Sequence, residues 1–201
     1  EPPFCNTCGA PFSGALEGSF RCVNCADRSF SFEFAHGAWT NRGAVRTLLG
    51  KCKYTRREYL ARPLSEFLLP ALDDERIDLS LDWTVVPVPL HPRRKRERGF
   101  NQAYEISRHF ARQVDLKLID ALQRTAYTTS QARLHRAQRL KNLRHAFRVK
   151  KEVIARHSLE NTPVLLIDDV FTTGATTNAC ARMLRREARA SQVVVLTLLR
   201  G

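Results

Sequence analysis

The carboxyl-terminal part of the chain contains the pattern that most narrows its possible folds. A continuous apolar run, Pro163-Val-Leu-Leu-Ile167, leads into Asp168 and Asp169 and then into a loop rich in Thr and Gly. A helical pattern reaching about residue 189 follows, and after it a second apolar run at 192–199. Apolar strands without polar alternation are buried on both faces, as in parallel sheets covered by helices. The pattern therefore predicts an α/β fold with a mainly parallel sheet.

Upstream segments supply the other elements of such a fold. Apolar residues spaced by three or four predict two helices between Ala44 and Leu72. A short strand is expected at Thr84–Val88, followed by a basic loop and by a helix over about Asn101–Val114. Strand, loop and helix together make one α/β unit.

The turn after the apolar run carries groups suited to a phosphorylated sugar. Ligands of parallel sheets bind at the carboxyl ends of strands, where Asp168 and Asp169 are expected. Residues 172–176 lead into a helix and offer N–H groups, hydroxyls and a helix N-terminus to a phosphate. Gly174 allows the backbone to approach closely. Because neighbouring strand residues face opposite sides, the two carboxylates are expected to have separate tasks rather than to share a proton.

The same residues also have a purely structural interpretation. The acids can end a strand and the threonines can cap a helix, as they do in many unrelated folds. Neither a Walker GxxxxGK[ST] pattern nor GxGxxG occurs in the chain. The residues alone therefore leave the ligand of this turn open.

Two CxxC pairs lie near the start of the chain, Cys5 with Cys8 and Cys22 with Cys25. Four cysteines at this spacing predict a tetrahedral zinc site, whose filled coordination sphere makes its role structural. Two disulfides or a redox CxxC are the alternatives, and they fit poorly with a chain that shows no secretory leader. A segment of ~30 residues buries too little surface to fold alone, so the metal is expected to stabilise it. We predict a zinc-binding module at residues 1–36 and a larger domain at 37–201.

The charge of the chain points to an anionic partner. Lys and Arg number 33 against 20 Asp and Glu, which gives a formal net charge of +13. Most of the excess lies between His91 and Arg148, where 15 basic residues accompany 4 acidic ones. A solvated surface is the alternative explanation, but this charge lies between two segments that resemble ligand loops. No run approaches the ~20 apolar residues of a membrane helix, and we expect a cytoplasmic protein.

Residues 124–148 are strongly basic and carry apolar residues spaced by three. Strict spacing by three drifts about 60° around a helix at each step, so this pattern makes a poor core helix. We expect a mobile, partly helical flap, whose basic residues would contact pyrophosphate, nucleic-acid phosphates or solvent.

These motifs resemble those of a known enzyme class. Four apolar residues followed by Asp-Asp-x-x-Thr-Thr-Gly-Ala-Thr are similar to the signature with which type I phosphoribosyltransferases bind phosphoribosyl pyrophosphate (PRPP). The resemblance implies that Asp168 and Asp169 contact the ribose hydroxyls and form the catalytic pair. It assigns the 5′-phosphate to the loop residues Thr172, Thr173, Gly174, Ala175 and Thr176.

The segment Pro87–Gln102 resembles the pyrophosphate loop of the ComF family, and the four cysteines extend this resemblance over nearly the whole chain. It implies a type I phosphoribosyltransferase-like parallel sheet flanked by helices, with a small N-terminal four-cysteine zinc module. Fork-shaped cationic donors suit a Mg²⁺-bound pyrophosphate. The residues expected to contact it are His91, Arg93, Arg94, Arg98, Asn101 and Gln102. No side chain identifies itself as a general base, since His91 suits contact with an anion equally well.

Two functions follow from the resemblance. ComF proteins are associated with natural competence, so we expect a protein that binds Mg-PRPP and handles imported single-stranded DNA, together with competence or recombination proteins. The alternative is an active phosphoribosyltransferase of nucleotide metabolism that acts on an unidentified acceptor and has no DNA role. Its catalysis would be mainly electrostatic, with magnesium and arginines stabilising the leaving group.

Overall fold

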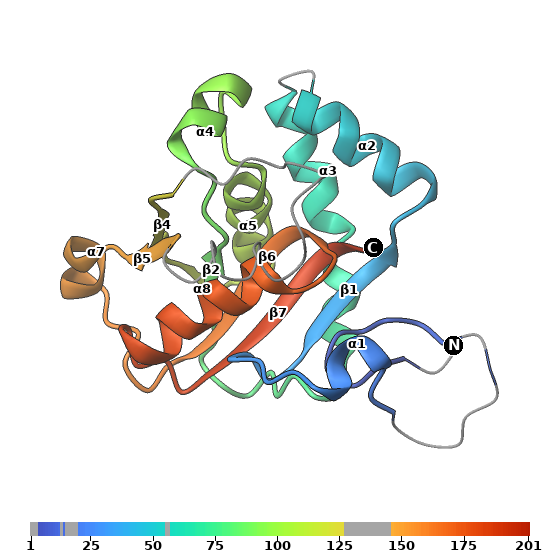
Figure 1. The fold of residues 1–201 in the computed structure, drawn as a ribbon. Helices are drawn as coiled ribbons and strands as arrows, with labels where there is room; N and C mark the ends of the chain where they lie inside the picture. Colours follow the sequence, from blue (N-terminus) through green and yellow to red (C-terminus); the bar gives the residue numbers. More distant parts are fainter. Residues whose placement is uncertain (1–3, 13, 15–19, 55–56, 127–145) are drawn as a thin grey trace.

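The structure is a computed structural model that describes residues 4–12, 14, 20–54, 57–126 and 146–201. Within these residues, five parallel strands form a sheet in the order β1-β7-β6-β2-β3 (Figure 1). Its strands are Ala35–Thr40 (β1), Thr84–Pro87 (β2), Lys117–Leu118 (β3), Pro163–Phe171 (β6) and Gln192–Arg200 (β7). A separate antiparallel pair joins Leu122–Arg124 (β4) to Phe147–Val149 (β5).

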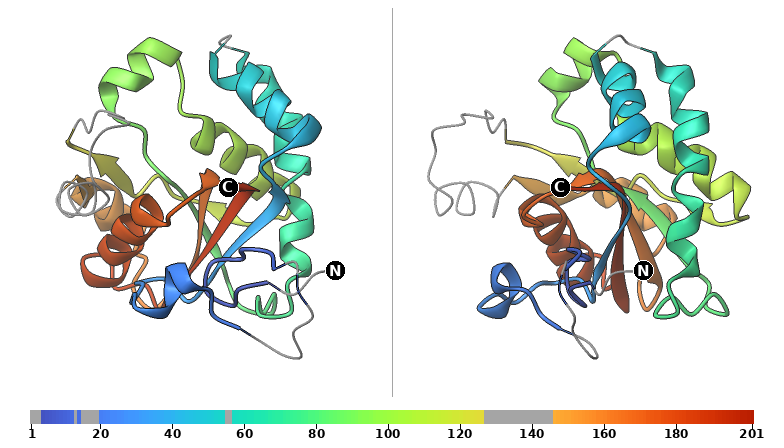
Figure 2. Two further views of the ribbon diagram at one scale, coloured as in Figure 1. Left: turned by 45° about the vertical axis from the view of Figure 1, so that its right-hand side comes forward. Right: turned by 90° about the vertical axis from the view of Figure 1, so that its right-hand side faces the viewer.

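Helices flank the sheet on both faces (Figure 2). The α-helices of the described residues are Val23–Ala26 (α1), Gly43–Tyr54 (α2), Ala61–Glu66 (α3), Pro92–Arg98 (α4), Gln102–Gln113 (α5), Lys151–Arg156 (α7) and Ala175–Arg186 (α8). Two short 3₁₀ helices, Glu58–Leu60 (η1) and Leu69–Asp73 (η2), flank α3. Helices α2 and α4 lie at the end of the sheet where the parallel strands terminate (Figure 1).

The central strands pack against two different sets of helices. Val164 and Leu166 of β6 belong to one buried cluster with residues of α8, whereas Leu165 and Ile167 belong to a second cluster with α2, α3 and α5. Burial on both faces explains why these strands are continuously apolar. The predicted fold class, a mainly parallel sheet flanked by helices with an N-terminal four-cysteine cluster, is confirmed.

Strand β6 is longer than its apolar run. It continues to Phe171 because β7 pairs with it to the end, with Val170 opposite Leu199. Strand β2 stops opposite Ile167. Asp168 and Asp169 therefore lie within β6, beyond the end of β2.

The prediction of a basic loop after β2 is wrong in one respect, because Pro92–Arg98 forms helix α4. His91 caps it by accepting a hydrogen bond from the Arg93 N–H at 3.1 Å. Proline is favoured at the first helical position, where its missing N–H costs nothing. Gly99 ends the helix with a φ of 91°, a conformation that glycine adopts without strain.

The other predicted helices agree in position with the structure. Helix α5 occupies 102–113 and buries Ile106 and Phe110, as its spacing predicts. Helix α8 ends at Arg186, slightly earlier than expected. The second helix predicted between residues 44 and 72 is short and is flanked by 3₁₀ turns.

The structure leaves two of the sequence predictions untested. The predicted flap at 124–148 has its ends in β4 and β5, and its residues 127–145 lie outside the described residues. Strand β1 crosses the predicted domain limit at residue 36, and that limit stays a prediction. Within the described part of the chain, no helix is both long and apolar enough to span a bilayer.

Candidate functional site

The turn between β6 and α8 encloses a small cavity of about 50 Å³ lined by Asp168 and residues 170–177. Gly174 stands at the start of α8 with a φ of 71°. A Cβ atom at this position would lie 2.6 Å from the Phe171 ring, so both the conformation and the space require glycine. Thr177 is buried and donates its hydroxyl to the Gly174 carbonyl at 3.2 Å. The turn therefore presents the open N-terminus of a twelve-residue helix to the cavity.

The two aspartates point to opposite sides of β6. Asp169 forms an ion pair with Lys53 of α2, with 2.8 Å between Nζ and Oδ2. Asp168 lies on the α8 side, where its charge helps to raise the pKa of Cys180 after the larger effect of burial. The predicted separation of the two side chains is thus observed, although their roles in ligand binding stay a prediction.

Asp168 has a strongly perturbed carboxyl group. Burial, followed by the charge of Asp169, raises its pKa to about 7, against a hydrogen bond from the Asp169 N–H at 2.8 Å and the charges of Lys53 and Arg124. A carboxyl group with this pKa changes charge near neutral pH. Perturbed groups of this kind cluster at functional sites.

Lys53 is a residue that the sequence pattern did not single out. Its helix was predicted from apolar spacing, and a lysine next to a buried cysteine gives no signal of its own. Only the packing of α2 over the end of β6 brings the ammonium group to Asp169.

The predicted pyrophosphate residues occupy α4 and the start of α5. Asn101 donates its side-chain amide to Val88 O at 3.0 Å, and Arg98 donates to Gln102 Oε1 at 3.0 Å. Arg93 is exposed and forms an ion pair with Glu97. Burial, followed by the charge of Arg124 and of nearby α4 arginines, lowers the pKa of His91.

A larger cavity of about 590 Å³ lies beside α4 and α5. Its lining includes Lys95, Asn101, Tyr104, Arg124 and Lys150. None of the residues that line it also lines the small cavity of the β6–α8 turn. Burial lowers the pKa of Arg124, and the charges of Arg94 in α4 and of Asp168 in β6 also act on this side chain. The structure thus assembles the turn residues closely, and places the α4 arginines in a neighbouring basic region.

The four N-terminal cysteines converge as predicted. Their Sγ atoms all lie within 4.8 Å of one another, and those of Cys8 and Cys22 are 3.7 Å apart. Zn–S bonds of ~2.3 Å in a tetrahedron give sulfur–sulfur edges of ~3.8 Å. A disulfide would need ~2.05 Å, and all six cysteines, which fall in the described ranges, are free thiols. The donor set therefore fits zinc.

The cost of ionising four neighbouring thiols also favours a bound cation. Burial, followed by hydrogen bonds with neighbouring cysteines, raises the pKa of Cys22 and of Cys25. At Cys5, backbone N–H donors outweigh burial and lower the pKa to about 7. Four thiolates at this separation are stable together only around a positive ion.

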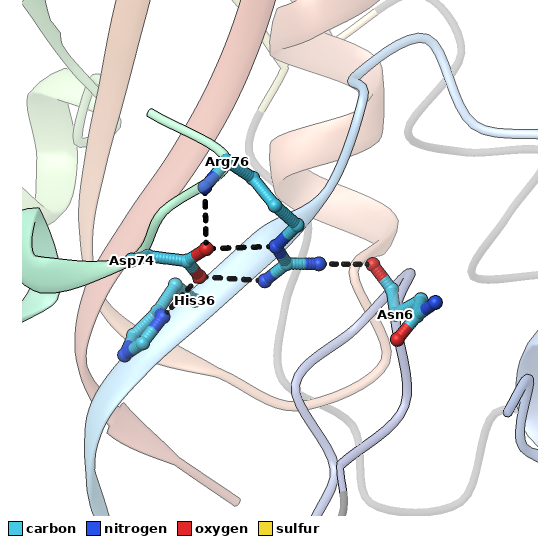
Figure 3. Close-up of polar contacts among 4 residues, drawn as sticks. All are labelled: Asn6, His36, Asp74 and Arg76. Atoms are coloured by element: carbon cyan, nitrogen blue, oxygen red, sulfur yellow. Dashed lines mark hydrogen bonds and ion pairs between the residues drawn. The ribbon is translucent and has the colours of Figure 1, made fainter. Parts of the chain in front are cut away.

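The cysteine module is attached to the main sheet by a polar network (Figure 3). Asp74 is buried and accepts from both Arg76, at 2.6 Å, and His36 of β1, at 2.7 Å. Burial alone would raise the pKa of Asp74, but hydrogen bonds from Arg76 and His36 hold it well below its usual range. Arg76 also donates to Asn6 O at 2.7 Å and lies 3.8 Å from the centroid of the Phe34 ring. The loop between Cys5 and Cys8 is thus held against β1.

Known proteins align with this chain over most of its length, although no family profile matches it. The chain is 30% identical over 194 residues to DNA utilization protein YhgH of Escherichia coli, covering 95% of this chain and 82% of the relative. It is 28% identical over 187 residues to Competence protein F of Haemophilus influenzae, covering 92% and 79%. Competence protein ComFC of Bacillus subtilis is 32% identical over 127 residues, covering 59% and 45%.

Solved structures that align with this chain include a phosphoribosyltransferase. An allosteric regulatory enzyme of purine biosynthesis aligns with a TM-score of 0.42 and 18% identity, over 69% of this chain and 25% of that one. A hypoxanthine phosphoribosyltransferase from Staphylococcus aureus aligns with a TM-score of 0.37 and 16% identity, over 79% and 65%. TM-scores this low carry no argument about the present chain. The sequence relatives show its family: with 30% identity across 82% of one of them and a converging four-cysteine site, the chain belongs to the ComF family.

Proposed function

We propose that the protein binds Mg-PRPP at the β6–α8 turn and takes part in the cytoplasm in handling imported single-stranded DNA during natural competence. The observation that carries the PRPP part is the Gly174 turn, which opens a helix N-terminus beside two carboxylates that point to opposite faces. Such a turn suits a phosphate, and the carboxylates suit the hydroxyls of the attached sugar.

Each group then has a defined task in the proposed complex. Residues 172–176 would donate N–H and hydroxyl hydrogen bonds to the 5′-phosphate. Asp168 and Asp169 would accept hydrogen bonds from ribose hydroxyls, and Lys53 would be released from Asp169 or shared with the ligand. Bound magnesium would neutralise part of the pyrophosphate charge. The basic region of α4 and α5 would hold the remaining negative charge through its arginines and Asn101.

The DNA part of the proposal rests on the relatives and on charge. Their names refer to competence and DNA utilization. A formal net charge of +13, concentrated in the segment that contains α4, suits a phosphate backbone. Competence and recombination proteins are the partners expected for such a role.

An active phosphoribosyltransferase is the second candidate, favoured by the cavity of about 590 Å³ beside α4 and α5. It has room for a small acceptor and is lined by both apolar and polar side chains. Acceptor-dependent release of pyrophosphate would distinguish this candidate from a PRPP-binding protein without turnover.

Calorimetric titration with PRPP, with and without magnesium, tests the proposed site. We expect magnesium-dependent binding by the zinc-loaded protein and its loss in the Asp168→Asn/Asp169→Asn double variant. The double variant Asp73→Asn/Asp82→Asn is the control, since it removes two negative charges at exposed positions. A folded wild-type protein that does not bind Mg-PRPP would exclude the PRPP part of the proposal.

Fluorescence anisotropy with a labelled single-stranded oligonucleotide tests the DNA part. Affinity should fall steeply with salt, and the negative slope of log K against log salt should shrink in magnitude by about 0.7 for each phosphate contact removed. Replacing Arg93, Arg94 and Arg96 by Gln should make this slope shallower, whereas Arg156→Gln in α7 should leave it unchanged. A salt-independent affinity would argue against phosphate contacts.

A further inference from the structure

Strand β7 ends in an arginine that contacts both the four-cysteine site and the β6–α8 turn. Arg200 Nε donates to Cys8 O at 2.8 Å, and its Nη2 donates to Cys8 Sγ at 3.3 Å. Its Nη1 donates to the carbonyl oxygen of Gly201 and to those of Phe171 and Thr172, the latter two at 3.3 Å each. The guanidinium also lies 5.2 Å from the centroid of the Phe171 ring. One side chain thus links a predicted metal ligand to the start of the turn.

A second arginine links the same two regions, but it belongs to the cysteine module rather than to the main sheet. Arg28 follows the second CxxC pair, and its Nη1 donates to Thr173 O at 2.8 Å. Nearby, the Ser31 N–H donates to Asn178 Oδ1 of α8 at 2.7 Å. A cavity of about 180 Å³ lies between the cysteine module and the turn, and both arginines line it. Phe171, Thr172 and Thr173 of the turn line both this cavity and the 50 Å³ cavity.

Holding these carbonyl groups also orients the donors of the turn. In a planar trans peptide, the C=O of one residue and the N–H of the next point in opposite directions. With Thr172 O directed at Arg200, the Thr173 N–H must point away from that arginine. With Thr173 O directed at Arg28, the Gly174 N–H must point away from the cysteine module. These two N–H groups belong to residues that line the small cavity.

The contact with Cys8 sulfur makes this arrangement sensitive to the metal. Groups that donate hydrogen bonds to a metal ligand hold it in place and tune its affinity for the ion. Arg76 holds the same cysteine loop at Asn6 O, and Arg200 holds it at Cys8 O.

We propose that Arg200 is a positioning residue that couples occupancy of the four-cysteine site to the orientation of the N–H donors in the β6–α8 turn. The ligand side of this inference rests on the proposed function, because it takes the turn to be a phosphate site. The consequence is that zinc-loaded protein holds the turn ready for an anion, and zinc-free protein does not.

The test compares two variants of Arg200. Arg200→Met retains an aliphatic stem of similar length but has no hydrogen-bond donors, whereas Arg200→Lys keeps the positive charge but cannot donate to several acceptors at once as the guanidinium does. Arg189→Gln is the control, because Arg189 is an exposed arginine that pairs with Glu160 away from the turn. Three quantities are measured: zinc release to a chromogenic chelator, hydrogen exchange of the amides at 172–176, and affinity for Mg-PRPP.

In Arg200→Met we expect zinc release about tenfold faster, faster exchange at 172–176 while the β6 and β7 amides stay protected, and about tenfold weaker Mg-PRPP binding. Arg200→Lys should recover part of each effect. Wild-type protein stripped of zinc should show the same local increase in exchange. An arginine that serves stability alone would instead increase exchange throughout the sheet.

Unchanged zinc release and exchange in a folded Arg200→Met protein would overturn the inference. If that variant does not fold, Arg200→Lys and zinc-stripped wild type decide the question by the same two measurements. Absence of Mg-PRPP binding by wild type would exclude the proposed ligand, but zinc release and exchange would still test the coupling.

Discussion

Replacing Asp168 by Asn should stabilise the folded protein while it removes the proposed function of the site. Burial, followed by the charge of Asp169, raises the pKa of this carboxyl from 3.8 to about 7. At ~1.36 kcal/mol per pKa unit, the ionised form would cost the fold up to ~4 kcal/mol above pH 7. Asp168 keeps some contact with solvent, which reduces the penalty to about 2 kcal/mol. Asparagine has no charge and can still accept the hydrogen bond that the Asp169 N–H donates.

The sign of the pH dependence follows from linkage. A carboxyl whose folded pKa is raised contributes full stability below its unfolded pKa, near 4, and loses it as the pH rises through about 7. The stability gained by Asp168→Asn should therefore be largest at pH 8, and less than half as large at pH 5.

Thermal unfolding of wild type and variant at pH 5 and pH 8 measures this difference. For a chain of this size, about 2 kcal/mol corresponds to a Tm increase of roughly 4–8 °C at pH 8. Asp73→Asn is the control, because it removes an exposed carboxylate and should leave the Tm unchanged. An Asp168→Asn variant that is destabilised equally at both pH values would refute the reasoning.

Three further perturbations address other parts of the structure. Arg76→Leu leaves the buried Asp74 carboxylate without its main donor, and should cost about 2–4 kcal/mol in urea unfolding at pH 7. Because the pKa of Asp74 is lowered in the fold, this difference should shrink as the pH falls below ~4, and a constant difference would contradict the assignment. Gly174→Ala should destabilise by about 1–3 kcal/mol, since its φ is 71° and its Cβ would meet the Phe171 ring. Gly50→Ala, in α2 with open space around it, should instead stabilise by up to ~1 kcal/mol, and equal effects in calorimetry would argue against backbone strain. Metal analysis should find about one zinc per chain in wild type and none in Cys22→Ser, with a lower Tm in the variant. Full zinc retention by Cys22→Ser would exclude the four-thiolate site.

The sequence carried the information for the elements that depend on local pattern. Continuous apolar runs predicted β6 and β7, because a strand buried on both faces has no polar positions. The spacing of Cys5, Cys8, Cys22 and Cys25 predicted their convergence, because each CxxC turn places two sulfurs together. The α4 helix was missed, although Pro92 and Gly99 were signals of its two ends, because the basic residues between them have no apolar face.

The sequence by itself determined the fold class, the four-cysteine site and the acidic turn, since each depends on residues that are close together in the chain. The tertiary structure alone decided which distant groups meet these motifs. Lys53 reaches Asp169 because α2 packs across the end of β6. Arg200 reaches Cys8 and Thr172 because β7 lies between β1 and β6 and ends beside the turn. No spacing in the sequence predicts such contacts, because they depend on the order of strands in the sheet and on how the helices pack against it.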